Sequence, residues 1–443
     1  MKKIHNTLFT LLALSTIILF NNCSKDEETE IPTSYCYIEE MTLGTLTRYE
    51  TNGDGETTTI TYAGSYYPMA IDQINGTITN TKALLLNTDR TIVPLTIEGE
   101  GNFSYRPVNS EEAWISFTSG NNVDFSTPIV FRATATDNKS SRDYIVTLTI
   151  RDNDPEAYTW QQMMPTGDAA SPLEGRQERH IVGWKGGLAI VSIDANQAYH
   201  VTTTSTLSSP TWTDMPCAGT DGADIRTLQS YAGKLWMSTT EGTLLASTDG
   251  QTWEPVQTEA SNIRLLAAAS SQLYACIDGT TICQSPNGTD WTATELDEES
   301  SLFPLTDFAS ATYIQHNQGY DVPRVAIIGT NGSTATTWNK IVDDDEPWAL
   351  LSQTGYDYSL PWQSLPEASL VAYSNKLIAI GNQSTTYVST NHGLIWNSYS
   401  QLTLDEGKKG SAGEHISATA AGEYIWVVAG PRVWRARLNG YGE

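Results

Sequence analysis

One segment concentrates the aromatic side chains that could bind a carbohydrate. In the stretch TGYDYSLPWQSLP, residues 354–366, the sequence places Tyr356, Tyr358 and Trp362 within seven positions. Flat aromatic faces pack against sugar rings, and loops on a rigid scaffold often carry binding residues. A loop of this kind can also pack on itself as a compact lid. The three aromatic residues are therefore candidate ligand-binding residues, with a self-packed loop as the alternative.

Basic residues in two other segments are further candidates for ligand binding. Arg176 and Arg179 occur in PLEGRQERH, residues 172–180. Lys408 occurs in the charged stretch TLDEGKKGSAGEH, residues 403–415, for which a solvated loop is the alternative.

The spacing of metal-ligating residues predicts no metal centre. The six histidines are scattered, and no Cys-x-x-Cys pair is present. The acidic stretches 295–300 and 343–346 lack the alternating oxygen ligands of a calcium-binding loop, so solvated turns explain them. We therefore expect no metal, no cofactor and no catalytic residue.

The overall charge excludes one class of partner. The 443-residue chain has 25 Lys and Arg residues against 51 Asp and Glu, a formal net charge of −26. Because such a field repels phosphate backbones, we expect no nucleic-acid binding. Frequent short turn clusters and few stretches of helical period indicate an all-β chain, and its length suggests two domains.

The N-terminal segment predicts export and attachment to a membrane. Lys2 and Lys3 precede an apolar stretch, residues 8–20, that is short for a transmembrane helix. The following LFNNC resembles a bacterial lipoprotein box, which implies lipidation of Cys23; a plain secretory signal is the alternative. The acidic tether, residues 24–35, begins SKDEETE and resembles the surface-export signal of Bacteroidota-type lipoproteins. We expect residues 1–23 to be a signal peptide and anchor, and the protein to be an outer-membrane lipoprotein exposed at the cell surface.

Two cysteines flank a predicted hairpin. Cys276 and Cys283 enclose IDGTTI. If Gly279 and Thr280 form the tip, the cysteines face each other and a cross-strand disulfide can form. If Asp278 and Gly279 form the tip, the register shifts and the cysteines miss each other. The sequence leaves both outcomes open.

Residues 36–152 are predicted to form a small β-sandwich. Six to eight short alternating stretches occur there, bounded by Gly, Asn, Asp or Pro. In the last stretch Tyr144, Val146 and Leu148 would share one face and Ile145 the other, as in a half-buried strand. The segment DFSTPIVFRATATDNKSSRDYIVTLTI resembles the terminal hairpin of immunoglobulin-like domains in bacterial surface lipoproteins. Residues 153–157 are predicted to be a linker.

From residue 158 onward tryptophans mark a longer repeat. Trp212, Trp253, Trp291, Trp348 and Trp396 follow turn clusters at separations of 41, 38, 57 and 48 residues. A period of about 40 to 50 residues is typical of β-propeller blades built from four strands each. The repeats predict a six-bladed β-propeller across residues 158–443.

The last repeat supplies only three strands, so an earlier segment is needed to complete it. The stretch YTWQQMMP, residues 158–165, precedes the first repeat and resembles an unpaired outer strand that carries Trp160. We predict that it pairs with the strand near residues 433–438 and closes the ring, which removes open sheet edges.

The recurrent turns STDGQTW, SPNGTDW and STNHGLIW resemble the Asp-box of sialidases and many other propellers. Each places an Asp or Asn, a Gly and a Trp in the same order: Asp249, Gly250 and Trp253; Asn287, Gly288 and Trp291; Asn391, Gly393 and Trp396. The Asp or Asn oxygen can accept hydrogen bonds from backbone N–H groups two residues on, and the glycine permits positive φ. The tryptophan offers an apolar face that packs one blade against the next. We therefore interpret these turns as structural.

The whole chain resembles Bacteroidota-type surface lipoproteins that carry an immunoglobulin-like N-terminal domain and a kelch/Asp-box-like propeller. This resemblance implies a non-catalytic binding or scaffolding role, with a glycan or a surface protein as partner and a lipid anchor in the membrane. The alternative is a sialidase-like glycosidase, which would need an arginine cluster, a tyrosine nucleophile with a glutamate partner, and an aspartic acid. The sialidase motif Phe/Tyr-Arg-Ile-Pro is absent from QERHIVGWKGG at the start of the first blade, so we expect no enzymatic activity.

Overall fold

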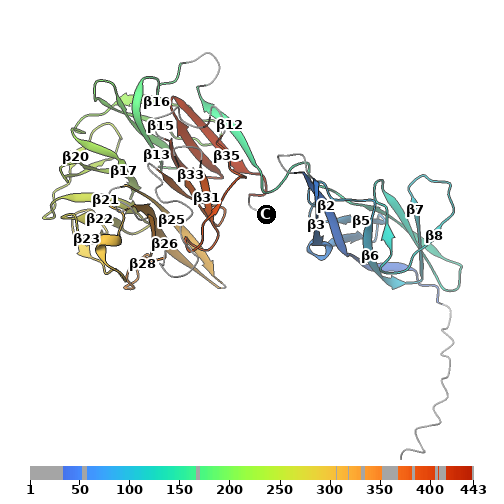
Figure 1. Ribbon diagram of the computed structural model, residues 1–443. Coiled ribbons are helices and arrows are strands. Elements are labelled where there is room, and N and C mark those ends of the chain that lie inside the picture. Colours follow the sequence, from blue (N-terminus) through green and yellow to red (C-terminus); the bar gives the residue numbers. More distant parts are fainter. Residues whose placement is uncertain are drawn as a thin grey trace, which may run out of the picture. The chain divides into compact units, whose positions relative to one another are not determined.

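The structure is a computed structural model that describes residues 33–51, 57–165, 170–305, 307–317, 319–330, 335–351, 368–381, 385–404, 408 and 416–441. Their regular structure is β, apart from two short 3-10 segments, η1 (Gly64–Tyr66) and η2 (Ser300–Leu302). The chain divides into two units, the first ending at Asp152 and the second beginning at Asn153 (Figure 1). No helix among the described residues has the length and apolar character needed to cross a membrane.

The first unit contains two sheets and a hairpin that share one apolar core. The three-stranded sheet has the order β1 (Tyr37–Leu43), β6 (Val93–Glu100) and β9 (Asn122–Val123). The six-stranded sheet has the order β4 (Met69–Asp72), β5 (Thr77–Asn80), β11 (Ser141–Thr147), β10 (Ile129–Thr134), β7 (Asn102–Pro107) and β8 (Ile115–Ser116). The hairpin is β2 (Thr45–Thr51) with β3 (Thr57–Ala63). In β11 Tyr144 and Val146 are buried and Ile145 is 43% exposed, the alternation predicted from the sequence.

The second unit contains six four-stranded sheets (Figure 1). Five of them follow chain order: β13 (Arg176–Trp184), β14 (Gly187–Asp194), β15 (Tyr199–Thr204) and β16 (Thr213–Pro216); β17 (Ala223–Tyr231), β18 (Lys234–Thr239), β19 (Leu244–Ser247) and β20 (Glu254–Pro255); β21 (Ile263–Ala268), β22 (Leu273–Ile277), β23 (Thr281–Ser285) and β24 (Thr292–Ala293); β25 (Asp307–Asn317), β26 (Tyr320–Thr330), β27 (Ala335–Ile341) and β28 (Ala349–Leu350); and β29 (Ser369–Tyr373), β30 (Lys376–Ile380), β31 (Thr386–Ser389) and β32 (Asn397–Ser398). The sixth has the order β12 (Tyr158–Met164), β35 (Arg432–Leu438), β34 (Tyr424–Ala429) and β33 (Ile416–Ala421).

The innermost strand is the first strand in each of the five sheets that follow chain order, and it is β33 in the sixth sheet. These strands contact one another in the order β13, β17, β21, β25, β29, β33 and back to β13. The apolar clusters of this unit lie between neighbouring sheets, and each draws buried side chains from two of them. The arrangement is that of a β-propeller, in which separate open sheets stand side by side and no sheet of the described residues closes on itself.

The predicted pairing of the segment around Trp160 with the C-terminal strand is present. Strand β12 runs antiparallel to β35, with Trp160 opposite Ala436. Beyond the ladder, Thr159 Oγ1 donates to Asn439 Oδ1 at 2.7 Å, across 280 positions of sequence. Trp160 packs, partly buried, against the apolar cluster between this sheet and the β29–β32 sheet.

The recurrent turns form the hydrogen bonds expected from their sequence. Asp249 Oδ1 accepts from the backbone N–H groups of Gln251 and Thr252, both at 2.8 Å. Asn287 Oδ1 accepts in the same way from Thr289 and Asp290, at 2.9 and 3.0 Å. In the longer third turn Asn391 Oδ1 accepts from the N–H of Ile395, four residues on, at 2.9 Å, because one extra residue is accommodated there.

The turn glycines and tryptophans pack against a neighbouring sheet. The φ angles of Gly250, Gly288 and Gly393 are 79°, 79° and 97°, in the left-handed region. A Cβ on Gly288 would lie 2.5 Å from Cζ3 of Trp236 in the preceding sheet. The tryptophans Trp253, Trp291 and Trp396 each donate from Nε1 to the carbonyl oxygen of the turn glycine, at 2.9, 3.1 and 3.0 Å. Trp253 and Trp396 are buried and Trp291 is partly buried in the clusters between sheets.

The cross-strand disulfide is not formed, which corrects that option of the sequence analysis. Cys276 and Cys283 are both free and buried. Ile277 pairs with Thr281, so the hairpin tip has three residues rather than two, and Cys276 lies opposite Ile282 while Cys283 lies opposite Ala275. The offset of one position sends the two thiols to opposite faces of the sheet.

Candidate functional site

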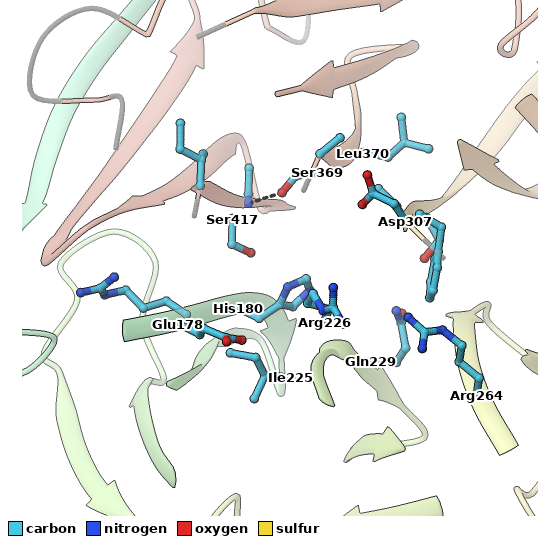
Figure 2. A pocket seen from close by; sticks show the side chains of 17 residues that line it. Glu178, His180, Ile225, Arg226, Gln229, Arg264, Asp307, Ser369, Leu370 and Ser417 are labelled. Carbon is cyan, nitrogen blue, oxygen red and sulfur yellow. Dashed lines mark hydrogen bonds between the residues drawn. The ribbon is translucent and has the colours of Figure 1, made fainter. Parts of the chain in front are cut away.

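The innermost strands surround a polar pocket close to their first residues, which we call the axial pocket (Figure 2). All six innermost strands or the residue just before them contribute to it. It is lined by Glu178, Arg179, His180, Ile225, Arg226, Gln229, Arg264, Asp307, Phe308, Ala309, Ser310, Ala368, Ser369, Leu370, Ile416, Ser417 and Ala418. About 770 Å³ of empty space lies in the hollow and in the open solvent at its mouth.

Irregularities in three of these strands turn polar side chains toward the pocket. The ladder between β13 and β14 shifts register between Arg176 and Glu178. The ladder between β17 and β18 shifts between Asp224 and Gln229, and that between β21 and β22 shifts after Leu265. Over their described residues β25, β29 and β33 pair without such shifts. Bulges redirect side chains and are common next to functional sites, and here they occur on the strands that carry Glu178, Arg226, Gln229 and Arg264.

Two pocket arginines share one carboxylate. Arg226 Nε and Nη2 donate to the two oxygens of Asp224 at 3.0 and 3.1 Å. Arg264 Nη2 lies 3.6 Å from Asp224 Oδ2, and the Asp224 side chain is only 7% exposed. The hydrogen bond with Asp224 is the main cause that raises the pKa of Arg226, and the negative charges of Asp224, Glu178 and Asp307 raise this pKa further, while burial opposes them. Arg226 therefore lies among three carboxylates.

The wall formed by β29 and β33 is fixed by serine hydroxyls. Ser369 Oγ accepts from the backbone N–H of Ala418 at 2.9 Å (Figure 2). Ser417 Oγ accepts from the N–H of Ile181 at 3.1 Å. Each bond joins the innermost strands of two neighbouring sheets, so these hydroxyls hold the ring around the pocket together.

The floor of the axial pocket separates it from a second hollow along the same axis. His180, Gln229, Ser310, Leu370 and Ala418 line both spaces. The second hollow is otherwise lined largely by small residues of the same strands. A ligand in the axial pocket would therefore contact the polar side chains at its wall and these five residues at its base.

Of the three predicted ligand-binding residues that the structure describes, Arg176, Arg179 and Lys408, only Arg179 lines the axial pocket. Its side chain is buried and donates to the backbone carbonyls of Leu173 and Arg176. Arg176 donates to Asp214 Oδ2 at 2.9 Å and lies 3.9 Å from Asp194 Oδ2, in a charge cluster of the first sheet.

The remaining predicted residues lie away from the axial pocket or outside the described residues. The Lys408 ammonium lies 5.3 Å from the ring centroid of Trp160 and 5.7 Å from that of Trp434. Tyr356, Tyr358, Trp362 and the predicted lipidation site Cys23 fall outside the described residues.

Apart from Arg179, the polar residues of the axial pocket were not predicted from the sequence. A repeat could have indicated two of them, because Ile225-Arg226-Thr227-Leu228 and Ile263-Arg264-Leu265-Leu266 occupy equivalent places in consecutive sheets. An arginine within an otherwise apolar inner strand is expensive to bury unless it has a partner or a ligand. Within the described part of the chain, no group of three or more His, Cys, Asp or Glu side chains could hold a metal ion.

Comparisons with known proteins identify the domains but not a close relative. The family model described as "DUF6242 beta propeller domain" matches residues 154–442, and the model of the DUF6242 N-terminal domain matches residues 41–148. No curated protein matches the chain.

Similar solved structures are distant. They include a DUF4623 family protein from Bacteroides eggerthii (11% identity, 90% of this chain and 98% of that chain, TM-score 0.38). The SapL1 lectin in complex with alpha methyl fucoside (13%, 58% and 90%, 0.38) and YCF48 bound to D1 peptide (15%, 65% and 96%, 0.32) are also similar. At these TM-scores the likenesses support no inference about what this chain binds.

Proposed function

The chain belongs to the DUF6242 family, which has a β-propeller domain, and from this premise we propose that it is a ligand-binding protein whose axial pocket is the binding site. The single observation that carries the proposal is the convergence of polar side chains from bulged inner strands on one hollow. The ligand is a glycan or part of a surface protein, and the role is binding rather than catalysis.

The proposal includes six blades and an immunoglobulin-like spacer. Six four-stranded sheets and the cyclic contacts of their innermost strands support a six-bladed propeller. Two sheets around one apolar core support an immunoglobulin-like sandwich in the first unit.

The lining of the axial pocket favours binding over sialidase-like hydrolysis. Its described lining residues include two carboxylates, Glu178 and Asp307, but no tyrosine that could serve as the nucleophile. Two of its serine hydroxyls already accept backbone hydrogen bonds from neighbouring strands.

A ligand screen with matched variants tests the binding role. The purified protein is probed on a glycan array and, by thermal shift, with peptides from candidate surface proteins. We compare two variants. Gln229→Leu removes an amide from the pocket, and Gln177→Leu removes an exposed amide outside the pocket, on the neighbouring innermost strand β13. Hits should persist in Gln177→Leu and weaken in Gln229→Leu. Ligands that bind Gln229→Leu as well as the natural protein would place the binding site elsewhere.

Two further experiments test the remaining parts of the proposal. A panel of aryl glycosides, including sialosides, should show no turnover; turnover that disappears in Glu178→Gln or Asp307→Asn would make the protein a glycosidase.

We also propose the lipid anchor at Cys23 and exposure at the cell surface. Cells fed an alkyne fatty acid should label the protein but not its Cys23→Ser variant, and external protease should digest it on intact cells. Equal labelling of both forms would exclude this anchor.

A further inference from the structure

We propose that the axial pocket binds a neutral pyranose, either as a free sugar or as the terminal residue of a glycan. The inference rests on the proposed binding function and names its ligand class.

Four polar side chains of the pocket lack a hydrogen bond to any other described residue: Glu178, Gln229, Arg264 and Ser310. Arg264 Nε is buried and has no acceptor among the described residues. Arg264 Nη2 lies 3.6 Å from Asp224 Oδ2, but the Arg226 guanidinium makes both hydrogen bonds to that carboxylate. The pocket therefore has donors and acceptors without a hydrogen-bond partner, which favours a ligand that both donates and accepts hydrogen bonds.

The charge balance of the pocket disfavours an anion. Three arginines line the pocket, Arg179, Arg226 and Arg264, and they face the carboxylates of Glu178 and Asp307, with Asp224 behind them. The three positive and three negative charges cancel in a chain with a net charge of −26, so the site has no excess positive charge to attract a phosphate or a sugar acid. Hydroxyl groups need no such excess because they carry no charge.

The placement of the side chains fits a ring that carries several hydroxyls. Figure 2 shows Glu178, Arg226, Gln229 and Arg264 following one another along one side of the cavity, with Ser369, Leu370 and Ser417 across from them. A pyranose can donate one hydroxyl to Glu178 while another hydroxyl accepts from Arg264. Phe308 also lines the pocket, with its ring centroid 5.4 Å from the Arg264 guanidinium carbon, and it adds an apolar group that the sugar C–H groups can contact.

The test is a binding titration of the full protein with defined sugars, followed by NMR. The probes are the methyl pyranosides of glucose, galactose, mannose and N-acetylglucosamine, with the matching uronates and glycine as charged comparisons. The variants are Glu178→Gln and Arg264→Gln. The control is Arg437→Gln, since the Arg437 side chain is 36% exposed against 35% for Arg264 but lies outside the pocket.

We expect at least one neutral pyranoside to bind, with little dependence on salt. Glu178→Gln and Arg264→Gln should each weaken its affinity about tenfold to hundredfold, the effect of losing a hydrogen bond to a charged group. Arg437→Gln should leave the affinity unchanged. A matched oligosaccharide that binds much more tightly than its terminal methyl glycoside would identify a glycan end as the source, and equal affinities would identify the free sugar.

Three results would overturn the inference, and they differ in what they mean for the proposed function. If only uronates, glycine or peptides bind and the pocket variants weaken them, the pocket is a binding site for another ligand class. If pyranosides bind but neither pocket variant matters, the sugar does not occupy this site and the proposed location of binding fails as well. If no probe binds, the sugar inference is wrong, and the proposed function is decided by the broader ligand screen.

Discussion

The packing of Gly288 against Trp236 leads to a quantitative prediction about the recurrent turns. Gly288 has a φ of 79°, and a Cβ there would lie 2.5 Å from Trp236 Cζ3 and 2.8 Å from Cη2. Trp236 cannot withdraw freely, because it is 4% exposed and its Nε1 donates to the Tyr231 carbonyl at 3.1 Å. Gly279, at the other end of β23, has a φ of 74° and nothing within 4 Å of its Cβ position. The two glycines therefore share the backbone requirement but differ in the space around them.

The change to alanine separates these two effects. A left-handed φ for alanine costs about 1–2 kcal/mol, so Gly279→Ala should lower the free energy of unfolding by about that amount. Gly288→Ala adds an overlap with Trp236, for which overpacking costs about 1–3 kcal/mol. Gly288→Ala should therefore destabilise by about 2–5 kcal/mol.

Urea denaturation followed by tryptophan fluorescence and circular dichroism measures both variants, using the transition of the second unit. In a Trp236→Phe background, which lacks the two overlapping ring atoms, the effect of Gly288→Ala should fall to that of Gly279→Ala. Equal losses for the two glycine variants in the natural background, within about 0.5 kcal/mol, would refute the reasoning.

Three further predictions concern other parts of the second unit. Arg435 is buried and donates to Gln161 Oε1 at 2.7 Å and to the Ser208 carbonyl at 3.1 Å, so Arg435→Ala should lower the free energy of unfolding by about 2–4 kcal/mol in urea titrations. Arg437→Ala loses only a surface pair with Glu423 and should change this free energy by less than about 0.5 kcal/mol. Similar losses in the two variants would contradict this prediction. The pKa of Asp249 is lowered, chiefly by the backbone N–H of Thr252. The ionised carboxylate therefore stabilises the fold at pH values above the pKa of Asp249 in the unfolded chain, and this contribution disappears as the pH falls through its pKa in the folded chain. The stability difference between the natural protein and Asp249→Asn should shrink below about pH 4. A difference independent of pH would exclude this role. Burial raises the pKa of Cys276 to about 11, so at pH 8 iodoacetamide should label Cys276 and Cys283 only in denaturant. A disulfide-linked peptide containing both cysteines would show that the register of the β22–β23 hairpin is wrong.

The architecture could be predicted from the sequence because its signals are local and repeated. The Asp or Asn, Gly and Trp of each recurrent turn form their own hydrogen bonds within a few residues, so their spacing alone identifies the turn. The alternation of Tyr144, Ile145 and Val146 follows the two-residue period of a strand. The pairing of β12 with β35 followed from counting strands, since the last repeat has only three.

The axial pocket could not be predicted because it depends on ladder register. The bulge between Asp224 and Gln229 is a property of how β17 pairs with β18, and no local pattern in the sequence specifies it. The same limit explains the cysteines. IDGTTI allows either two-residue tip, whereas the structure has a three-residue tip in which Asp278 and Gly279 both have positive φ.

The pairing of β12 with β35 makes the second unit dependent on the synthesis of its last strand. Strands β33 and β34 can form their hairpin early, but Ala436, the partner of Trp160, is synthesised after the other five sheets of the unit. Contacts of such long sequence separation form slowly. A chain that stops before residue 432 leaves β12 and β34 with unpaired edges, which are sites for aggregation and degradation. The fold therefore discriminates against truncated chains without any dedicated sequence signal.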